Sequence, residues 1–159
     1  MIKLWMAPAG LHIEPGRLGD ARELARIHAL GFYRGWPAGE FESFLADANT
    51  PVYVACDSRR RIAGFALIRL VADESELLTI AVDPKWRGKR IGQALLDAVF
   101  QDLMLSPARR MFLEVSEENL AAIKLYQRHG FAVTSSRKGY YAKADGSAAT
   151  ALVMARDLG

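Results

Sequence analysis

The sequence predicts one α/β domain: a mixed, mostly antiparallel central sheet flanked by helices on both faces. Segments of strand and helix character follow the order β-α-α-β-β-β-α-β-α-β-β. The strand-like segments 52–56, 62–71 and 76–82 are separated only by short turns, which favours an antiparallel meander. Later strands are separated by helical segments, as crossover connections require. A chain of 159 residues suits a single core.

In the first half, residues 11–13 are expected to open the sheet. Asp20 can cap a helix that runs to about Gly31, with apolar residues at three-to-four spacing. A loop with Gly35 and Trp36 leads to a second helix over 37–48, which begins at a proline. Turns are expected at 49–51, 57–61 and 72–75.

In the second half, a long helix is expected over 88–105, because apolar residues recur there about every four positions until Ser106-Pro107. A strand over 111–115 and a helix over 118–129, closed by Gly130, come next. Strands over 131–141 and 149–156 complete the domain. We assign residues 1–10 to a disordered or docked N-terminal extension and 11–159 to the domain.

Composition narrows the functional classes. The single Cys56 excludes an internal disulfide, so we expect a cytoplasmic location. Three scattered histidines offer no metal-ligand spacing, so no metal is expected. No apolar run approaches the roughly 20 residues that span a bilayer, so no membrane association is expected. The Arg59–Arg61 run is interpreted as a solvated hairpin tip, and nucleic acid is not expected as a partner.

One block of motifs resembles a known family. The block comprises 78-LTIAVDP-84, 87-RGKRIG-92, 113-LEV-115, 119-NLAAIKLY-126, Gly130-Phe131, Tyr140-Tyr141 and Asp145-Gly146. Taken in this order, these motifs resemble the GNAT superfamily of N-acetyltransferases, most closely its RimI type, which acetylates the N-terminal alanine of a ribosomal protein. The similarity covers about residues 11–158, and it implies the GNAT fold and acetyl-CoA as co-substrate.

The basic turn between a strand and a helix suits a diphosphate, because backbone N–H groups and the helix dipole converge there. The resemblance assigns to the acetyl-CoA pyrophosphate the residues Arg87, Gly88, Lys89, Arg90, Ile91 and Gly92. Arg90 stands where the family usually has glycine; we expect it within the first helical turn, where a side chain does no harm. The resemblance also assigns the backbone of Ile80, Ala81 and Val82 to the cofactor, and the N–H of Val82 or Ile80 to an oxyanion.

The resemblance implies that Glu114 is the general base and that Tyr126 is the acid that protonates the leaving sulfur. From the residues alone, the favoured interpretation of Glu114 is a strand residue that faces solvent or pairs with an arginine, and that of Tyr126 is an aromatic anchor of its helix. Asn119 resembles the asparagine that hydrogen-bonds the cofactor, or it is a helix cap. No pattern supports Cys56 as a nucleophile, so we expect direct transfer through a ternary complex.

Two walls are expected around the acceptor. Trp36 and Phe41 belong to the first, although Phe41 is as compatible with the core; Tyr140 and Tyr141 belong to the second. Gly139 replaces a common asparagine, and 147-SAAT-150 replaces a usually acidic stretch. We expect an N-terminal acetyltransferase for a protein or peptide, possibly ribosomal, as a monomer or homodimer. The alternatives are a small-molecule amine acetyltransferase and a non-catalytic acyl-CoA sensor.

Overall fold

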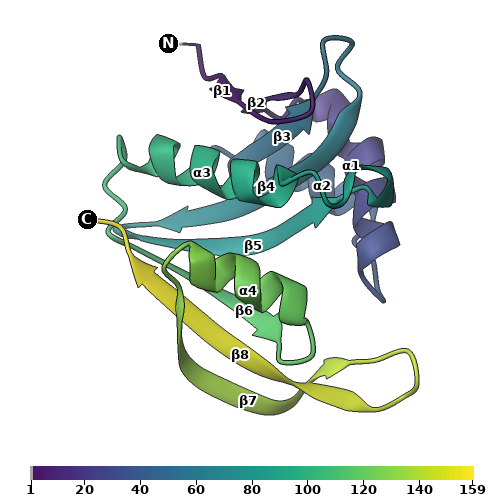
Figure 1. The fold of residues 1–159 in the computed structure, drawn as a ribbon, viewed down its shortest axis with the longest axis vertical. Coiled ribbons are helices and arrows are strands. Elements are labelled where there is room, and N and C mark those ends of the chain that lie inside the picture. Colours follow the sequence, from purple (N-terminus) through teal and green to yellow (C-terminus); the bar gives the residue numbers. More distant parts are fainter. Residues whose placement is uncertain (1) are drawn as a thin grey trace.

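The computed structural model describes residues 2–159, except for the side chain of Tyr141. One eight-stranded sheet runs through the described part of the chain (Figure 1). The strands are β1 (Trp5–Met6), β2 (His12–Pro15), β3 (Val52–Cys56), β4 (Ile62–Val71), β5 (Glu74–Val82), β6 (Arg110–Ser116), β7 (Ala132–Ala142) and β8 (Ala148–Asp157). The helices are α1 (Ala21–Gly31), α2 (Ala38–Ala46), α3 (Ile91–Leu103) and α4 (Leu120–Arg128), with 3-10 turns η1 (Leu18–Asp20) and η2 (Pro84–Trp86).

The sheet has the order β1-β2-β3-β4-β5-β6-β8-β7, and only the β5–β6 pair is parallel. Helices α3 and α4 cover one face, and α1 and α2 cover the other (Figure 1). The predicted mixed, mostly antiparallel sheet with helices on both faces is therefore confirmed. The single parallel pair follows from the α3 crossover, since parallel neighbours need a long connection.

The N-terminal segment was expected to be either disordered or docked on the domain, and it is docked. Trp5 pairs with Ile13 and Met6 with His12, which makes β1 an edge strand that the sequence did not predict. The Trp5 ring lies 5.7 Å from the ring of Tyr53 and thereby attaches this segment to β3. Two residues are too short for a strand pattern to be recognised.

Several boundaries differ from those predicted. Helix α3 begins at Ile91, not at residue 88, because Gly88 and Arg90 both have positive φ. The strand predicted over 11–13 is β2, His12–Pro15, and β5 begins two residues earlier than predicted. The ends of helices and strands depend on single backbone angles and caps, and the spacing of apolar residues in the sequence does not indicate these.

The feature that positions the site is the separation of β5 from β6. Their pairing runs from Glu74↔Arg110 to Leu77↔Leu113 and then stops, although both strands continue. Next to this point the β4–β5 register shifts, with Leu67 opposite Thr79 and Ile68 opposite Leu77. Leu78 is the extra residue of a bulge, a feature that bends and twists a strand. Beyond Leu77, β5 and β6 therefore diverge.

An ion pair fixes the end of β5. Arg26 of α1 contacts the 2% exposed Asp83 with an Nη2–Oδ2 distance of 2.9 Å. Burial alone would raise the pKa of Asp83, but hydrogen bonds from the Arg26 guanidinium and the Lys85 N–H lower it overall. The carboxylate thus joins α1 to the start of the loop that follows β5.

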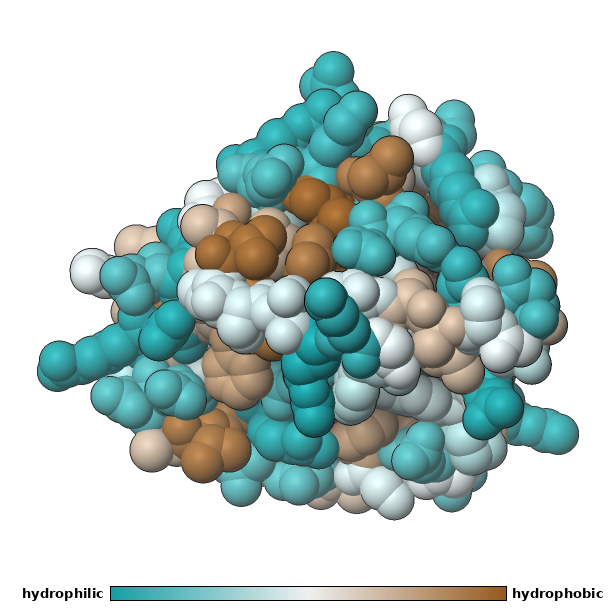
Figure 2. Space-filling model, turned by 90° about the horizontal axis from the view of Figure 1, so that it is seen from below, coloured by the Kyte–Doolittle hydropathy of each residue, from teal (hydrophilic) through white to brown (hydrophobic). Residues whose placement is uncertain are grey.

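The surface at the end that carries the β7–β8 hairpin is mixed. Apolar residues there form small groups among hydrophilic ones (Figure 2). Isolated apolar residues are normal on protein surfaces. None of the helices in residues 2–159 is long and apolar enough to cross a membrane.

Candidate active site

The divergence of the two strands leaves backbone groups of β5 directed at the gap. The N–H of Asp83 donates to the Ala63 carbonyl oxygen of β4 at 2.7 Å. Because successive residues of a strand direct their N–H and C=O groups to opposite sides, Ala81 also faces β4. The backbone groups of Val82 and Ile80 therefore face the gap, where β6 no longer pairs. These are the two residues expected to supply backbone N–H groups.

The loop after β5 has the geometry of an anion-binding turn. Gly88 has φ 76° and Arg90 has φ 61°, so left-handed residues alternate with others just before α3. Such alternation curves the backbone so that successive N–H groups point inward. The first α3 hydrogen bond joins the Ala94 N–H to the Arg90 carbonyl oxygen, and the side chain of the N-cap residue Arg90 makes no capping hydrogen bond to the N–H groups before Ala94. These groups fit a diphosphate.

Arg90 differs from its expected conformation. It is the N-cap of α3 in the left-handed region (φ 61°, ψ 29°) and does not lie within the first helical turn. The expectation that its Cβ would be conformationally harmless is therefore wrong. A non-glycine residue in this region costs about 1–2 kcal/mol, so the arginine is strained where the family usually has glycine.

Gly92 allows two helices to approach. A Cβ at this position would lie 3.3 Å from Leu125 Cδ2 of α4. The absence of a side chain thus permits α3 to pack closely on α4. Its expected part in cofactor binding is limited to the backbone and remains a prediction.

Glu114 lies on β6 immediately after the last β5–β6 pair. Its neighbours Leu113 and Val115 are buried in the core beneath α3 and α4, so Glu114 faces the opposite side of the sheet. Its side chain is 28% exposed, and Arg137 Nη1 of β7 lies 3.4 Å from its Oε1. A partly exposed carboxylate beside the gap is available to a substrate.

A second carboxylate, Glu76 of β5, lies on the same face as Glu114. Glu76 is opposite Phe112, two residues before Glu114 on β6. Burial raises the pKa of Glu76, Arg69 opposes this rise, and the negative charge of Glu114 adds to it. Sequence reasoning did not single out Glu76, because only the parallel register brings it near Glu114.

Tyr126 of α4 is 6% exposed and its ring contacts the Phe131 ring edge-on at 5.9 Å. This is the anchoring use that the sequence allowed; contact of its hydroxyl with a cofactor sulfur stays a prediction. Asn119 is the N-cap of α4, since its Oδ1 accepts the Ala122 N–H at 3.2 Å. The cap alternative for Asn119 is thus observed, and its contact with the cofactor also stays a prediction.

The first wall expected around the acceptor is the loop between α1 and α2. Trp36 is partly buried there, and its ring lies 4.6 Å from His28 and 5.9 Å from Phe41. Phe41 itself is 0% exposed and belongs to the core beneath α1 and α2. Its assignment to an acceptor-binding surface is therefore wrong, because a fully buried ring supports the wall from behind.

The second wall expected around the acceptor lies on β7. Tyr140 is 50% exposed, and the Arg137 guanidinium lies 4.3 Å from the centre of its ring. Arg137 thereby joins Tyr140 to Glu114, a role that nothing in the sequence pattern indicated. The register with β8 shifts between Arg137 and Tyr141, and Gly139 there has φ 67°. The side chain of Tyr141 lies outside the described part, so its expected contact stays a prediction.

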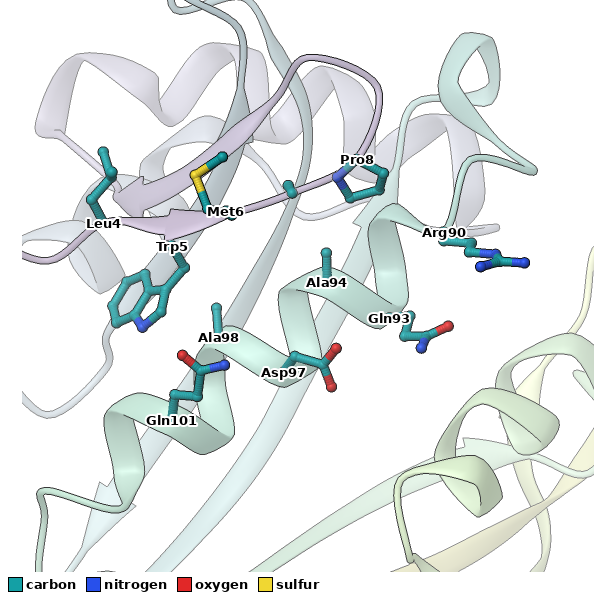
Figure 3. A pocket seen from close by; sticks show the side chains of 11 residues that line it. Leu4, Trp5, Met6, Pro8, Arg90, Gln93, Ala94, Asp97, Ala98 and Gln101 are labelled. Carbon is teal, nitrogen blue, oxygen red and sulfur yellow. The ribbon is translucent and has the colours of Figure 1, made fainter.

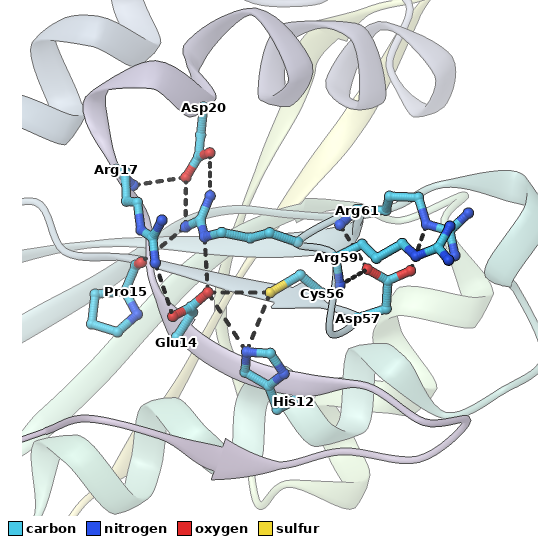
Figure 4. A network of polar contacts seen from close by, with 10 residues as sticks. His12, Glu14, Pro15, Arg17, Asp20, Cys56, Asp57, Arg59 and Arg61 are labelled. Carbon is cyan, nitrogen blue, oxygen red and sulfur yellow. Dashed lines mark hydrogen bonds and ion pairs between the residues drawn. The ribbon is translucent and has the colours of Figure 1, made fainter.

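A polar cluster lies on β2 and β3, away from this site (Figure 4). Pairing of His12 with Cys56 brings together His12, Glu14 and Cys56, with ligand atoms within 4.8 Å, although the sequence suggested scattered histidines. However, Arg60 Nε donates to Glu14 Oε1 at 2.8 Å, and a guanidinium on this oxygen opposes a divalent cation. Burial, mainly, raises the pKa of the Cys56 thiol to about 12, so it is a poor nucleophile.

Arg60 also corrects the interpretation of the arginine run. Its side chain is 20% exposed and pairs with Asp20 at the start of α1, so it is not a solvated tip residue. Arg61 is 74% exposed and pairs locally with Asp57. The run lies in the β3–β4 hairpin as predicted, but one of its members joins this hairpin to a helix.

Open grooves also flank α3. One, of about 610 Å³, lies between the N-terminal segment and α3, with Trp5 and Arg90 at opposite ends (Figure 3). Another, of about 640 Å³, lies between α3 and the His129–Gly130 turn. Neither groove is lined by Glu114, Glu76 or Tyr126, so the candidate active site is the gap between β5 and β6.

This fold, with its gap between two diverging strands, is the one expected of the GNAT superfamily, and comparison with known proteins agrees with that class. Residues 21–131 match the model of the acetyltransferase (GNAT) family. The chain belongs to this family.

The relatives are more specific. An Escherichia coli K12 protein named [ribosomal protein bS18]-alanine N-acetyltransferase is 38% identical over 86 residues, which is 54% of this chain and 58% of that protein. The match thus spans little more than half the length of that relative. A Bacillus subtilis protein provisionally given the same name is 30% identical over 79% of this chain and 83% of its own.

Solved structures extend the likeness to the whole fold. The crystal structure of the Escherichia coli ribosomal-protein-S18-alanine N-acetyltransferase has a TM-score of 0.87 and 28% identity, covering 94% of each chain. Arabidopsis thaliana NAA60 in complex with acetyl-CoA has a TM-score of 0.84 at 20% identity, covering 93% of this chain and 98% of that one. The second likeness shows the fold alone.

Proposed function

We propose that this chain is an acetyl-CoA-dependent N-acetyltransferase that acts on the N-terminal amino group of a protein or peptide, with a ribosomal protein beginning with alanine as the expected acceptor. The observation that carries the proposal is the position of Glu114 on β6, where the pairing with β5 ends and the Ile80 and Val82 backbone faces the gap. The names of the relatives support the acceptor. A cytoplasmic location belongs to the same proposal.

The donor half of the site is the loop 87–92 and the free edge of β5. Acetyl-CoA, when bound, supplies an activated acetyl thioester. The uncapped N–H groups at the start of α3, with Arg87 and Lys89 nearby, would hold its diphosphate. The backbone of Ile80 and Val82 would hold the amides of its pantetheine arm.

The acceptor half supplies the proton transfers. Glu114 accepts a proton from the amine, directly or through one water, and the N–H of Val82 or Ile80 stabilises negative charge at the acetyl oxygen. An α-amino group has a pKa near 8, against about 10.4 for a lysine side chain, so a carboxylate is a sufficient base for an N-terminus at neutral pH. As the amine nitrogen bonds to the acetyl carbon and the thioester C–S bond breaks, Tyr126 would donate a proton to the sulfur.

The test is release of free thiol from acetyl-CoA with two short peptides. One begins with a free alanine and lacks lysine; the other has a blocked N-terminus and one internal lysine. Turnover with the first alone is expected. Turnover with the second alone would replace this proposal by a lysine acetyltransferase.

Turnover with neither peptide would also overturn it. In that case small amines would be tried as acceptors. Tight binding of acetyl-CoA without turnover of any amine would favour a sensor.

A further inference from the structure

His28 of α1 is a polar residue in aromatic surroundings. The residue is only 1% exposed. Its ring stacks on the Phe32 ring, with ring centres 4.1 Å apart and an interplanar angle of 7°, and on the Trp36 ring, with 4.6 Å and 27°. The rings of Phe41 and Phe65 lie 5.7 Å and 6.4 Å away. A phenylalanine would fill such a place without the cost of burying polar atoms. The nitrogens of His28 therefore require an explanation.

One nitrogen of His28 holds the backbone of the acceptor wall. The N–H of Trp36 donates to His28 Nδ1 at 3.1 Å. An Nδ1 that accepts carries no proton, so in the neutral ring the proton is on Nε2. Burial lowers the pKa of His28 to about 4, which keeps Nδ1 an acceptor at neutral pH.

The other nitrogen, Nε2, shows that burying His28 lowers the stability of the folded chain. His28 Nε2 is buried and has no hydrogen-bond partner among the described residues. A buried donor without a partner is destabilising. Among side chains of this size, histidine combines a flat ring for stacking with an acceptor at the position that the Trp36 N–H requires; tryptophan offers only a donor.

The loop that carries Trp36 is folded tightly onto α1. A Cβ at Gly35 would lie 2.8 Å from Ala29 Cα and 2.9 Å from Ala29 Cβ, so any other residue would displace the loop from α1. The same loop presents Phe32, 40% exposed, and Tyr33, 58% exposed. Its shape is thus set at two adjacent points, by the contact of Gly35 with Ala29 and by the hydrogen bond to His28.

We infer that His28 is the positioning residue of the acceptor wall: its Nδ1 fixes the Trp36 backbone, and its ring is the surface on which Phe32 and Trp36 stack. His28 thereby determines how well the site holds the first residues of an extended peptide, without touching that peptide. This inference rests on the proposed function, because it takes the α1–α2 loop as the surface that receives the acceptor.

Two variants separate the acceptor atom from the ring. His28→Phe keeps a ring and removes Nδ1; His28→Asn keeps an acceptor near the place of Nδ1 and removes the ring. Leu30→Ala, at a 50% exposed position of the same helix, is the matched control. The readouts are peptide KM, acetyl-CoA KM and kcat with the alanine peptide, together with hydrogen exchange of the loop 32–37 in the full chain.

We expect His28→Phe to raise the peptide KM about tenfold, as loss of a backbone-fixing hydrogen bond predicts, with kcat and acetyl-CoA KM within about twofold. Exchange of the 32–37 amides should quicken in His28→Phe, less so in His28→Asn, and not in Leu30→Ala. An unchanged peptide KM in a folded His28→Phe protein would overturn the inference, as would an equal loss in kcat and both KM values.

Gly35→Ala keeps the test open if the His28 variants do not fold. It displaces the same loop while residue 28 remains histidine. It should also raise the peptide KM without changing kcat or the acetyl-CoA KM. No change in the peptide KM would overturn the inference. Failure of the proposed function is distinguishable, because the native chain would then release no thiol with any peptide. Loop exchange that does not differ between native chain and His28→Phe would in that case refute the role of His28.

Discussion

The two sides of the gap are built differently. On the β5 side, the expected acceptor wall is formed by rings around the buried His28; Phe41 and Phe65 are buried, Trp36 is partly buried, and Asp83 is held by Arg26. On the β6 side, Glu114, Arg137 and Tyr140 meet at a surface that is largely exposed. Packing determines the geometry of the first side, whereas charge contacts in water determine that of the second. Substitutions on the first side should therefore affect folding and shape, and those on the second should affect chemistry and salt dependence.

The largest expected effect is on the exposed side. Glu114→Gln keeps the size of the side chain and removes the proposed base, so turnover should fall by a factor on the order of a hundred or more, with acetyl-CoA affinity nearly unchanged. Thiol release and acetyl-CoA binding are measured on the same preparation. Glu76→Gln is the control for loss of a nearby charge. A normal rate in Glu114→Gln would remove Glu114 from the mechanism and leave Glu76 to be examined as the base.

The packed side should be sensitive to acid. The pKa of His28 is about 4 in the folded chain, below its usual 6.5, so the unfolded chain binds the extra proton first. The stability that His28 contributes is complete above about pH 6.5 and is lost as pH falls towards 4, by a total on the order of 3 kcal/mol. Denaturant unfolding of the native chain and His28→Phe across this pH range measures it. Parallel pH curves for the two proteins would contradict the prediction.

The loop before α3 offers a smaller effect on the β5 side. Arg90→Gly should relieve the strain of a left-handed arginine, about 1 kcal/mol, and raise Tm by about 2–4 °C. Arg90→Ala retains the strain and is the matched control. Thermal unfolding of the three proteins gives the comparison. Equal Tm values for the glycine and alanine variants would show that Arg90 is not strained.

The smallest effect is expected at Arg137. Its contact with Glu114 is more than half exposed on the arginine side, so Arg137→Ala should raise the peptide KM only about twofold to threefold. The effect should shrink at high salt, because exposed charge contacts are screened. Initial rates at low and high salt test this, with Lys138→Ala, an exposed cation on the same strand, as control. A loss independent of salt would indicate that packing, and not charge, matters on this side too.

Local pattern predicted the fold well and the site in part. The periodicity of 52–82 and the 87-RGKRIG-92 turn predicted the meander, the crossover helix and the turn that precedes it, because each depends on nearby residues. Pairs far apart in sequence were not predictable: Arg137 beside Glu114 and Glu76 beside Glu114 arise from strand register, and Arg60 on Asp20 arises from the packing of a hairpin on a helix. The left-handed angle of Arg90 and the burial of Phe41 also depend on the surroundings that a single sequence does not report.

The short pairing of β5 with β6 has a mechanical consequence. Four residue pairs, Glu74–Leu77 with Arg110–Leu113, make the only sheet contact between the N-terminal strands β1–β5 and the C-terminal strands β6–β8 in the part of the chain that the structure describes. Within the sheet, these four pairs are thus the only pairing that joins the two halves in the described part of the chain, and the gap opens where this pairing ends. A molecule bound in the gap would contact both β5 and β6 beyond their last pair, so its binding should reduce the relative motion of the two halves of the sheet.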